Sequence, residues 1–358
     1  MNSFLSYIPK PDVAPLPSPG WLFVFFIVFT FILHLLFMNL TLGGSILMII
    51  SRWRKDHGKE ISKEIAKFNT FTISMTITTG VAPLLFLQVV YGQFFYSSSV
   101  ILGWKWLLVL AALSIGYYCY YLYKLADGDK GFGWGVVATI MFLYVALILV
   151  ANTLLSMQPD KWLPIYTHKI SAFDVKSLIP RFLHMILAAT AFTGVFLMVY
   201  SKLRKSLSED VAKSMYNFGK NSFLGATLLQ IVVGPWFLLS NSKDVISHLL
   251  QSPGGLTFLI IGIASGFLGA YLIFTKGESA LKLSILMLVS MISMVLVRRV
   301  VENAYFSKYF DYTKLKVSPQ WDVFILFCLL LVGLLIVLFI TFKKNYFELK
   351  NRKEAVNG

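Results

Sequence analysis

Cysteine and charge are both scarce in this chain of 358 residues. Its two cysteines, Cys119 and Cys328, lie inside apolar runs, which argues against a disulfide framework or a zinc site. No CxxCH motif is present, so the chain carries no covalent c-type heme of its own. Charged residues make up 14% of the chain, whereas ordinary soluble domains have about a quarter. Nothing resembles a nucleic-acid-binding module, so we expect no nucleic-acid partner.

Acidic residues are the scarcer of the charged types. Aspartate and glutamate number 17 against 32 lysines and arginines, which gives a formal charge of +15. In a membrane protein such an excess reports first on topology and only then on partners. The first twenty residues are rich in proline and lack the basic stretch that opens a secretory signal. We therefore expect residues 1–20 to form an outer segment and not a cleaved signal.

Apolar residues are abundant, at 57% of the chain. A helix needs about 20 mainly apolar residues to cross a bilayer. The sequence predicts nine such spans, at residues 21–50, 71–96, 101–123, 134–157, 179–200, 221–240, 254–275, 279–303 and 320–342. The expected fold class is therefore all-α integral membrane, with a membrane domain at 21–342 and a basic tail at 343–358.

The loops between these spans differ in basic charge. One set of loops holds 20 of the 32 basic residues, and the opposite set holds 9. The richer set comprises Arg52, Arg54, Lys55, Lys59, Lys63, Lys67, Lys124, Lys130, Lys202, Arg204, Lys205, Lys213, Lys220, Lys276, Lys282, Lys343, Lys344, Lys350, Arg352 and Lys353. Because cytoplasmic loops carry the excess of lysine and arginine, we expect the N-terminus outside and the C-terminus in the cytoplasm.

Ionisable residues inside the predicted spans gather in their outer halves. His34 lies in the first span, Lys105 in the third, His184 in the fifth, and Arg298 and Arg299 in the eighth. Histidine nitrogen is an iron ligand, and arginine or lysine pairs with heme propionates, so this set suits a buried heme. Two other interpretations remain open. A membrane histidine also bonds a neighbouring helix, and the cations also snorkel to headgroups.

The eighth span is also rich in methionine. Met287, Met291 and Met294 recur at helical spacing, which is typical of packing. A thioether iron ligand among them is the alternative interpretation.

Several segments in the first five spans resemble subunit I of the cytochrome bd oxidase family. They are, in order, HLLFMNLTLGG, KEISKEIAKFNTF, TTGVAPLLFLQ, ALILVANTLLSMQPD and PRFLHMILAATAFTGVFLM. The resemblance implies that His34 ligates a high-spin b heme and His184 a low-spin b heme. It covers about residues 21–205 by motif and the remainder mainly by topology.

The chain departs from that family in four places. The third span has no carboxylate, and Lys105 falls in the region of one of the two glutamates that family members carry. The loop between the sixth and seventh spans is about a dozen residues long, where the family has a long quinol-binding loop. The GRQPW segment is missing, with only VLVRRVVENAYF in its region, and the seventh span lacks a methionine. The chain therefore resembles a divergent, short-loop relative of the type associated with cytochrome c.

These observations predict a membrane electron-transfer subunit of a respiratory complex in a bacterial cytoplasmic membrane. It would hold two or more b hemes through His34, His184, Arg298, Arg299 and Lys105, with heme d left undecided. The electron donor would be a c-type cytochrome or a quinol, and other membrane subunits would be its partners. The chain is an oxidoreductase if the resemblance extends to oxygen reduction. The alternatives are a quinone or cytochrome electron-transfer subunit that does not reduce oxygen, and a heme-free structural subunit.

Overall fold

Helices make up nearly all of the computed structural model, which describes residues 8–11, 14–126, 131–275 and 280–357. The long helices are α1 (Gly20–Arg52), α2 (Gly58–Leu102), α3 (Trp104–Leu125), α4 (Phe132–Ser156), α6 (Val175–Leu203), α7 (Glu209–Leu239), α9 (Pro253–Thr275), α10 (Ala280–Phe306) and α11 (Trp321–Asn357). Short connections are η2 (Pro159–Lys161), α5 (Trp162–Tyr166), α8 (Lys243–Gln251) and η3 (Tyr312–Lys314). Lys130, Lys276 and part of the proline-rich segment 1–20 lie outside the described residues.

The number of membrane spans agrees with the prediction. Within the described ranges, nine helices are long and apolar enough to cross a bilayer, and each contains one predicted span almost entirely. The chain is therefore a multi-pass membrane protein of all-helical fold. The orientation of its ends stays a prediction. α2 differs most from expectation, because it begins at Gly58 and not near residue 71.

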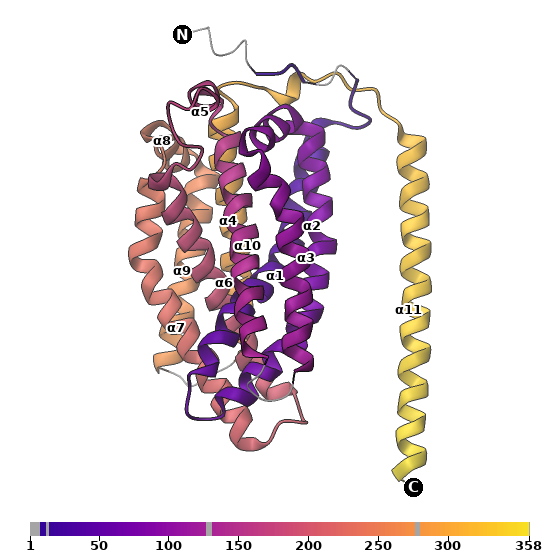
Figure 1. Ribbon diagram of the computed structural model, residues 1–358. Helices are drawn as coiled ribbons and strands as arrows, with labels where there is room; N and C mark the ends of the chain where they lie inside the picture. The colour runs from indigo at the N-terminus through magenta and orange to yellow at the C-terminus, as the bar shows by residue number, and fades with distance from the viewer. Residues whose placement is uncertain (1–7, 12–13, 127–130, 276–279, 358) are drawn as a thin grey trace. The chain divides into compact units, whose positions relative to one another are not determined.

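The chain divides into two compact units. The first contains Met1–Pro11 and Phe23–Asp311, and the second contains Asp12–Leu22 and Tyr312–Gly358. In the first unit, α1–α4, α6, α7, α9 and α10 form an elongated bundle (Figure 1). In the second, the amide of Leu16 donates to the Lys316 carbonyl and the amide of Ser318 donates to the Leu16 carbonyl, each at 2.8 Å. These bonds join the N-terminal segment to the residues that precede α11.

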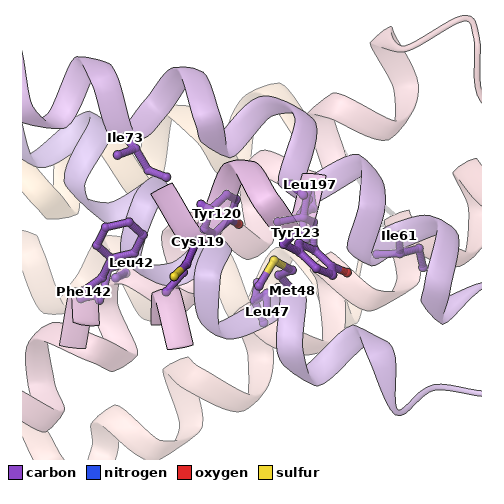
Figure 2. Close-up of a cluster of buried hydrophobic side chains, with 14 of the residues drawn as sticks. Leu42, Leu47, Met48, Ile61, Ile73, Cys119, Tyr120, Tyr123, Phe142 and Leu197 are labelled. Atoms are coloured by element: carbon purple, nitrogen blue, oxygen red, sulfur yellow. The ribbon is translucent and has the colours of Figure 1, made fainter. Parts of the chain in front are cut away.

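The core of the bundle lies where α1, α2, α3, α4 and α6 meet (Figure 2). Leu47, Met48, Ile61 and Tyr120 are almost completely buried there. A methyl group at Gly43 of α1 would collide with the Ala189 carbonyl of α6, so only glycine permits this close approach. Small residues bring backbones together in the same way in many membrane helix pairs.

Helices α6 and α7 also meet through glycine. A Cβ on Gly194 would lie 2.6 Å from the carbonyl oxygen of Gly219 and 2.8 Å from the amide nitrogen of Phe223. Gly219 faces Gly194 in return. This contact fixes how α7 lies against α6, the helix that carries His184.

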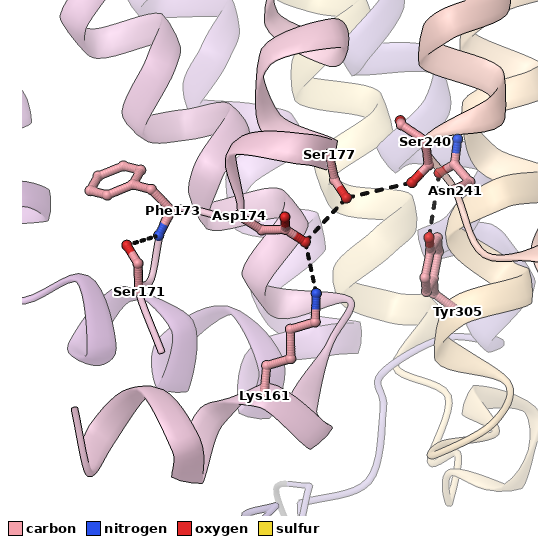
Figure 3. Close-up of polar contacts among 8 residues, drawn as sticks. All are labelled: Lys161, Ser171, Phe173, Asp174, Ser177, Ser240, Asn241 and Tyr305. Atoms are coloured by element: carbon pink, nitrogen blue, oxygen red, sulfur yellow. Dashed lines mark hydrogen bonds and ion pairs between the residues drawn. The ribbon is translucent and has the colours of Figure 1, made fainter. Parts of the chain in front are cut away.

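Polar contacts tie the connections together at the end of the bundle where α6 begins (Figure 3). The Lys161 ammonium donates to the Asp174 carboxylate at 2.8 Å, and the Ser177 hydroxyl donates to the same carboxylate at 3.2 Å. Burial alone would raise the pKa of Asp174, but these two neighbours outweigh it and lower the pKa. At the same end, burial and the Asp160 carboxylate raise the pKa of Tyr309 to about 12.

Candidate functional site

His34 projects from α1 onto α2. Its Nδ1 lies 3.1 Å from the backbone carbonyl oxygen of Thr76. A carbonyl oxygen only accepts hydrogen bonds, so Nδ1 carries the proton in this contact. In a neutral imidazole the lone pair then resides on Nε2. An Nδ1–H bonded to a backbone carbonyl is the usual support of a metal-ligating histidine, because it fixes both tautomer and ring orientation.

Gly80 makes room for this ring on α2. A Cβ at position 80 would lie 2.9 Å from Cε1 and 3.0 Å from Nδ1 of His34. Thr76 and Gly80 are one turn apart, so a single face of α2 both holds and accommodates the imidazole. Gly80 belongs to the TTGVAPLLFLQ segment noted in the sequence, and Thr76 lies just before that segment.

An arginine approaches His34 across an aromatic ring. The rings of Phe31 and His34 have centroids 6.2 Å apart, and the Arg298 guanidinium carbon lies 4.2 Å from the Phe31 centroid. Phe31 therefore neighbours both the imidazole and a cation contributed by α10.

His184 has a similar arrangement on α6. Its ring centroid lies 5.2 Å from that of Phe237 on α7, and the Arg181 guanidinium carbon lies 5.0 Å from the same Phe237 centroid. The Nδ1 atom of His184 is buried and makes no well-formed hydrogen bond among the described residues, and the Gln230 side chain interacts with this imidazole. A buried imidazole nitrogen left in this way calls for an explanation, such as an ion or group that the protein binds there.

Three arginines lie around one carboxylate near these histidines. Arg298 Nε donates to Glu302 Oε1 at 2.7 Å, and Arg299 Nη1 lies 3.8 Å from Glu302 Oε2. Arg181 interacts electrostatically with the same carboxylate. Arg299 also donates to the Tyr91 hydroxyl at 2.6 Å, where α2 departs from helical geometry.

We call Arg181, Arg298, Arg299 and Glu302 the arginine cluster. Its three guanidinium groups share one carboxylate. Glu302 is only 8% exposed, and Nε of Arg181 is buried without a hydrogen-bond partner in the described chain. Several guanidinium groups gathered around one carboxylate form a surface that an anionic ligand can complement.

No protein-family model and no curated protein matches this chain. Among solved structures, the bd oxidase from Geobacillus thermodenitrificans matches with a TM-score of 0.68. The chain has a bd oxidase-like fold. The match covers 90% of this chain and 97% of that one, at 11% sequence identity. At so low an identity the likeness concerns the fold alone.

The arginines predicted for the site lie near the histidines, whereas Lys105 does not contact them in the described part of the chain. Arg298 contacts Phe31, the ring next to His34, and both Arg298 and Arg299 belong to the arginine cluster. Lys105 has other neighbours: its ammonium lies 5.0 Å from the Trp104 ring and 5.8 Å from the Phe173 ring. These contacts suit a cation that snorkels along aromatic side chains.

The three methionines of α10 make packing contacts. Met291 Sδ accepts from the Asn39 amide at 3.7 Å, Met294 lies against Gly262, and Met287 packs on a buried cluster of α6, α7, α9 and α10 residues. In the described ranges, no three His, Cys, Asp or Glu side chains converge as a metal cluster would require. A heme needs only one or two axial side chains, so that observation does not bear on it.

Sequence reasoning missed Arg181, Glu302 and Tyr91 as members of the site. Arg181 lies at the start of the predicted span 179–200, one helical turn before His184. Glu302 lies one turn after Arg298, within the quoted segment VLVRRVVENAYF. Spacing of three or four residues on a helix was the available signal in both cases.

Proposed function

We propose that this chain is a membrane electron-transfer subunit that binds b-type heme non-covalently through His34 and His184. The observation that carries the proposal is the repeated unit of histidine, aromatic ring and arginine: His34, Phe31 and Arg298 in one place, His184, Phe237 and Arg181 in the other. The bd oxidase-like fold supports the proposal as an observation separate from the side-chain geometry.

The residues present fit heme in three respects. The Thr76 carbonyl favours the His34 tautomer whose Nε2 is available to iron. The buried Nδ1 of His184 makes no well-formed hydrogen bond in the described chain, which suits an imidazole that binds a group. The arginine cluster lies near both histidines, and guanidinium groups are suitable partners for heme propionates.

Bound heme would supply one-electron redox chemistry. The chain would orient each imidazole, exclude water through the surrounding apolar residues, and neutralise propionates through Arg298, Arg299 and Arg181. Lys105 would pair with a propionate only after leaving its aromatic neighbours. Electrons would come from a c-type cytochrome or a quinol, in a respiratory complex of a bacterial cytoplasmic membrane.

A reduced-minus-oxidised spectrum of the purified protein tests this proposal. We expect b-heme bands in the wild type and loss of a distinct component in His34→Ala and in His184→Ala. His248→Ala is the matched control, since His248 lies in the short helix α8, and it should keep the whole spectrum. A protein purified without porphyrin, or spectra unchanged in both variants, would refute the proposal and favour the heme-free structural subunit.

A second candidate is an electron-transfer subunit that passes electrons between a quinone and a cytochrome without reducing oxygen. The absence of a carboxylate from the third span favours it, since oxygen reduction consumes protons that internal glutamates deliver in the bd family. Oxygen uptake by the purified complex, with and without cyanide, separates the two. Oxygen uptake that cyanide inhibits supports the oxidase. The absence of oxygen uptake supports the carrier.

A further inference from the structure

Asn69 is the centre of a buried polar network that links three helices. This residue of α2 is fully buried. Its amide nitrogen lies 3.1 Å from the Thr41 carbonyl oxygen, 3.2 Å from Ser45 Oγ and 2.9 Å from the Tyr120 hydroxyl. Thr41 and Ser45 belong to α1 and Tyr120 to α3, where Figure 2 shows its ring inside the core.

The network continues along α2 to the carbonyl that holds His34. Thr72 donates to Asn69 Oδ1 at 2.5 Å, and the Thr41 hydroxyl lies 3.2 Å from that of Thr72 and 2.8 Å from that of Thr76. The Thr76 carbonyl then accepts from His34 Nδ1. Each hydroxyl or amide in this series is within hydrogen-bond distance of the next side chain.

These contacts define an antiparallel register between α1 and α2. Moving along α1 from His34 to Thr41 to Ser45, the partners on α2 run backwards from Thr76 to Thr72 to Asn69. One helical turn is about 5.4 Å, so a slip of one turn would take His34 out of reach of the Thr76 carbonyl.

The network fixes position more than it adds stability. A hydrogen bond between membrane helices contributes little stability on average. Apolar residues at positions 41, 69 and 72 would hold the two helices together, but they would tolerate several registers. Directional hydrogen bonds at three successive points allow a single register, as a buried asparagine does in coiled coils.

We propose that Asn69, Thr41 and Thr72 are positioning residues for His34. They hold α1 in the register at which the Thr76 carbonyl keeps Nδ1 protonated and leaves Nε2 free for a ligand. The tautomer is a property of the chain itself. The consequence for heme rests on the proposed function.

The test measures the His34 tautomer in the full-length chain prepared without heme. The protein has five histidines, so ¹⁵N-histidine NMR with His34→Ala as reference assigns the signal. We expect Nδ1–H in the wild type. In Asn69→Leu and in Thr41→Val, the ratio of Nδ1–H to Nε2–H should fall by roughly five- to tenfold, the effect of losing about one hydrogen bond.

Thr190→Val is the matched control. The Thr190 hydroxyl of α6 donates to the Ile186 carbonyl of its own helix at 2.8 Å and takes no part in the network between α1 and α2. This variant should keep the wild-type tautomer ratio. A wild-type ratio in both Asn69→Leu and Thr41→Val would overturn the proposal. If Asn69→Leu fails to fold, the isosteric Thr41→Val decides.

A second readout applies to the heme-loaded protein. In Thr41→Val the midpoint potential of the component lost in His34→Ala should shift, while that of the His184 component stays in place. An unshifted potential for the His34 component in Thr41→Val would count against the positioning role. A colourless protein whose His34 tautomer still responds to Thr41→Val would refute heme binding and leave the positioning role intact.

Discussion

At the scale of single residues, the histidines are defined by what surrounds their rings. His34 combines a carbonyl on Nδ1 with a glycine under the ring, and His184 combines a buried nitrogen with an aromatic neighbour. In each unit one phenyl ring neighbours both the imidazole and an arginine.

Gly80→Ala adds only one methyl group, but it should displace the His34 ring. The new methyl group would lie 2.9 Å from His34 Cε1, so the ring must rotate away from the Thr76 carbonyl. We expect loss or a shift of the spectral component that His34→Ala removes. Gly225→Ala is the control, because nothing lies within 4 Å of the position where its Cβ would stand. A wild-type spectrum for Gly80→Ala would contradict this packing.

Glu302→Gln should destabilise the protein strongly. It leaves three guanidinium groups without their shared carboxylate, and removing one partner from a buried ion pair costs about 3 kcal/mol or more. Thermal unfolding in detergent measures the loss. Asp244→Asn provides the comparison, since Asp244 pairs with Lys308 at 3.2 Å but is 80% exposed, and exposed pairs contribute little. Equal midpoints for the two variants would show that Glu302 is hydrated.

At the scale of helices, the number of elements followed from composition, whereas their ends did not. A run of apolar residues sets the span, so all nine were found. The N-terminal part of α2 was missed because Lys59, Lys63 and Lys67 make it look like a loop. Its other face, with Ile61 and Ile65, is completely buried, and this tertiary packing extends the helix.

The contact between α6 and α7 should depend on two glycines. In Gly194→Leu the side chain would enter the space of the Gly219 carbonyl, so α7 must move away from the helix that carries His184. Overpacking of this kind costs about 1–3 kcal/mol or more. Gly225→Leu on the open face of α7 should leave the unfolding midpoint nearly unchanged. A similar midpoint in both variants would mean that the helices do not approach closely.

Part of the candidate site was predictable and part was not. His34, His184, Arg298 and Arg299 stand out because ionisable residues are rare in apolar runs. Thr76 contributes only its backbone carbonyl, which every residue has, and Asn69 looks like an ordinary polar residue near a helix start. Their roles depend on the register between α1 and α2, and that register is a property of the folded pair.

At the scale of the whole molecule, the basic loops predict the orientation. Fusions ending after Trp53 should place a reporter in the cytoplasm, and fusions ending after Thr167 should place it outside. Alkaline phosphatase, active only outside, and a fluorescent protein that matures in the cytoplasm give opposite readouts at each site. Phosphatase activity at Trp53 together with fluorescence at Thr167 would invert the predicted topology.

The arginine cluster has a consequence for biogenesis. If the arginine cluster of α6 and α10 binds an anionic cofactor, these helices would pack fully only once that cofactor is in place. Newly made chains in cells starved of the counterion would stay loosely assembled and exposed to quality-control proteases. Cellular abundance would then track cofactor supply, with the cluster acting as the checkpoint for maturation.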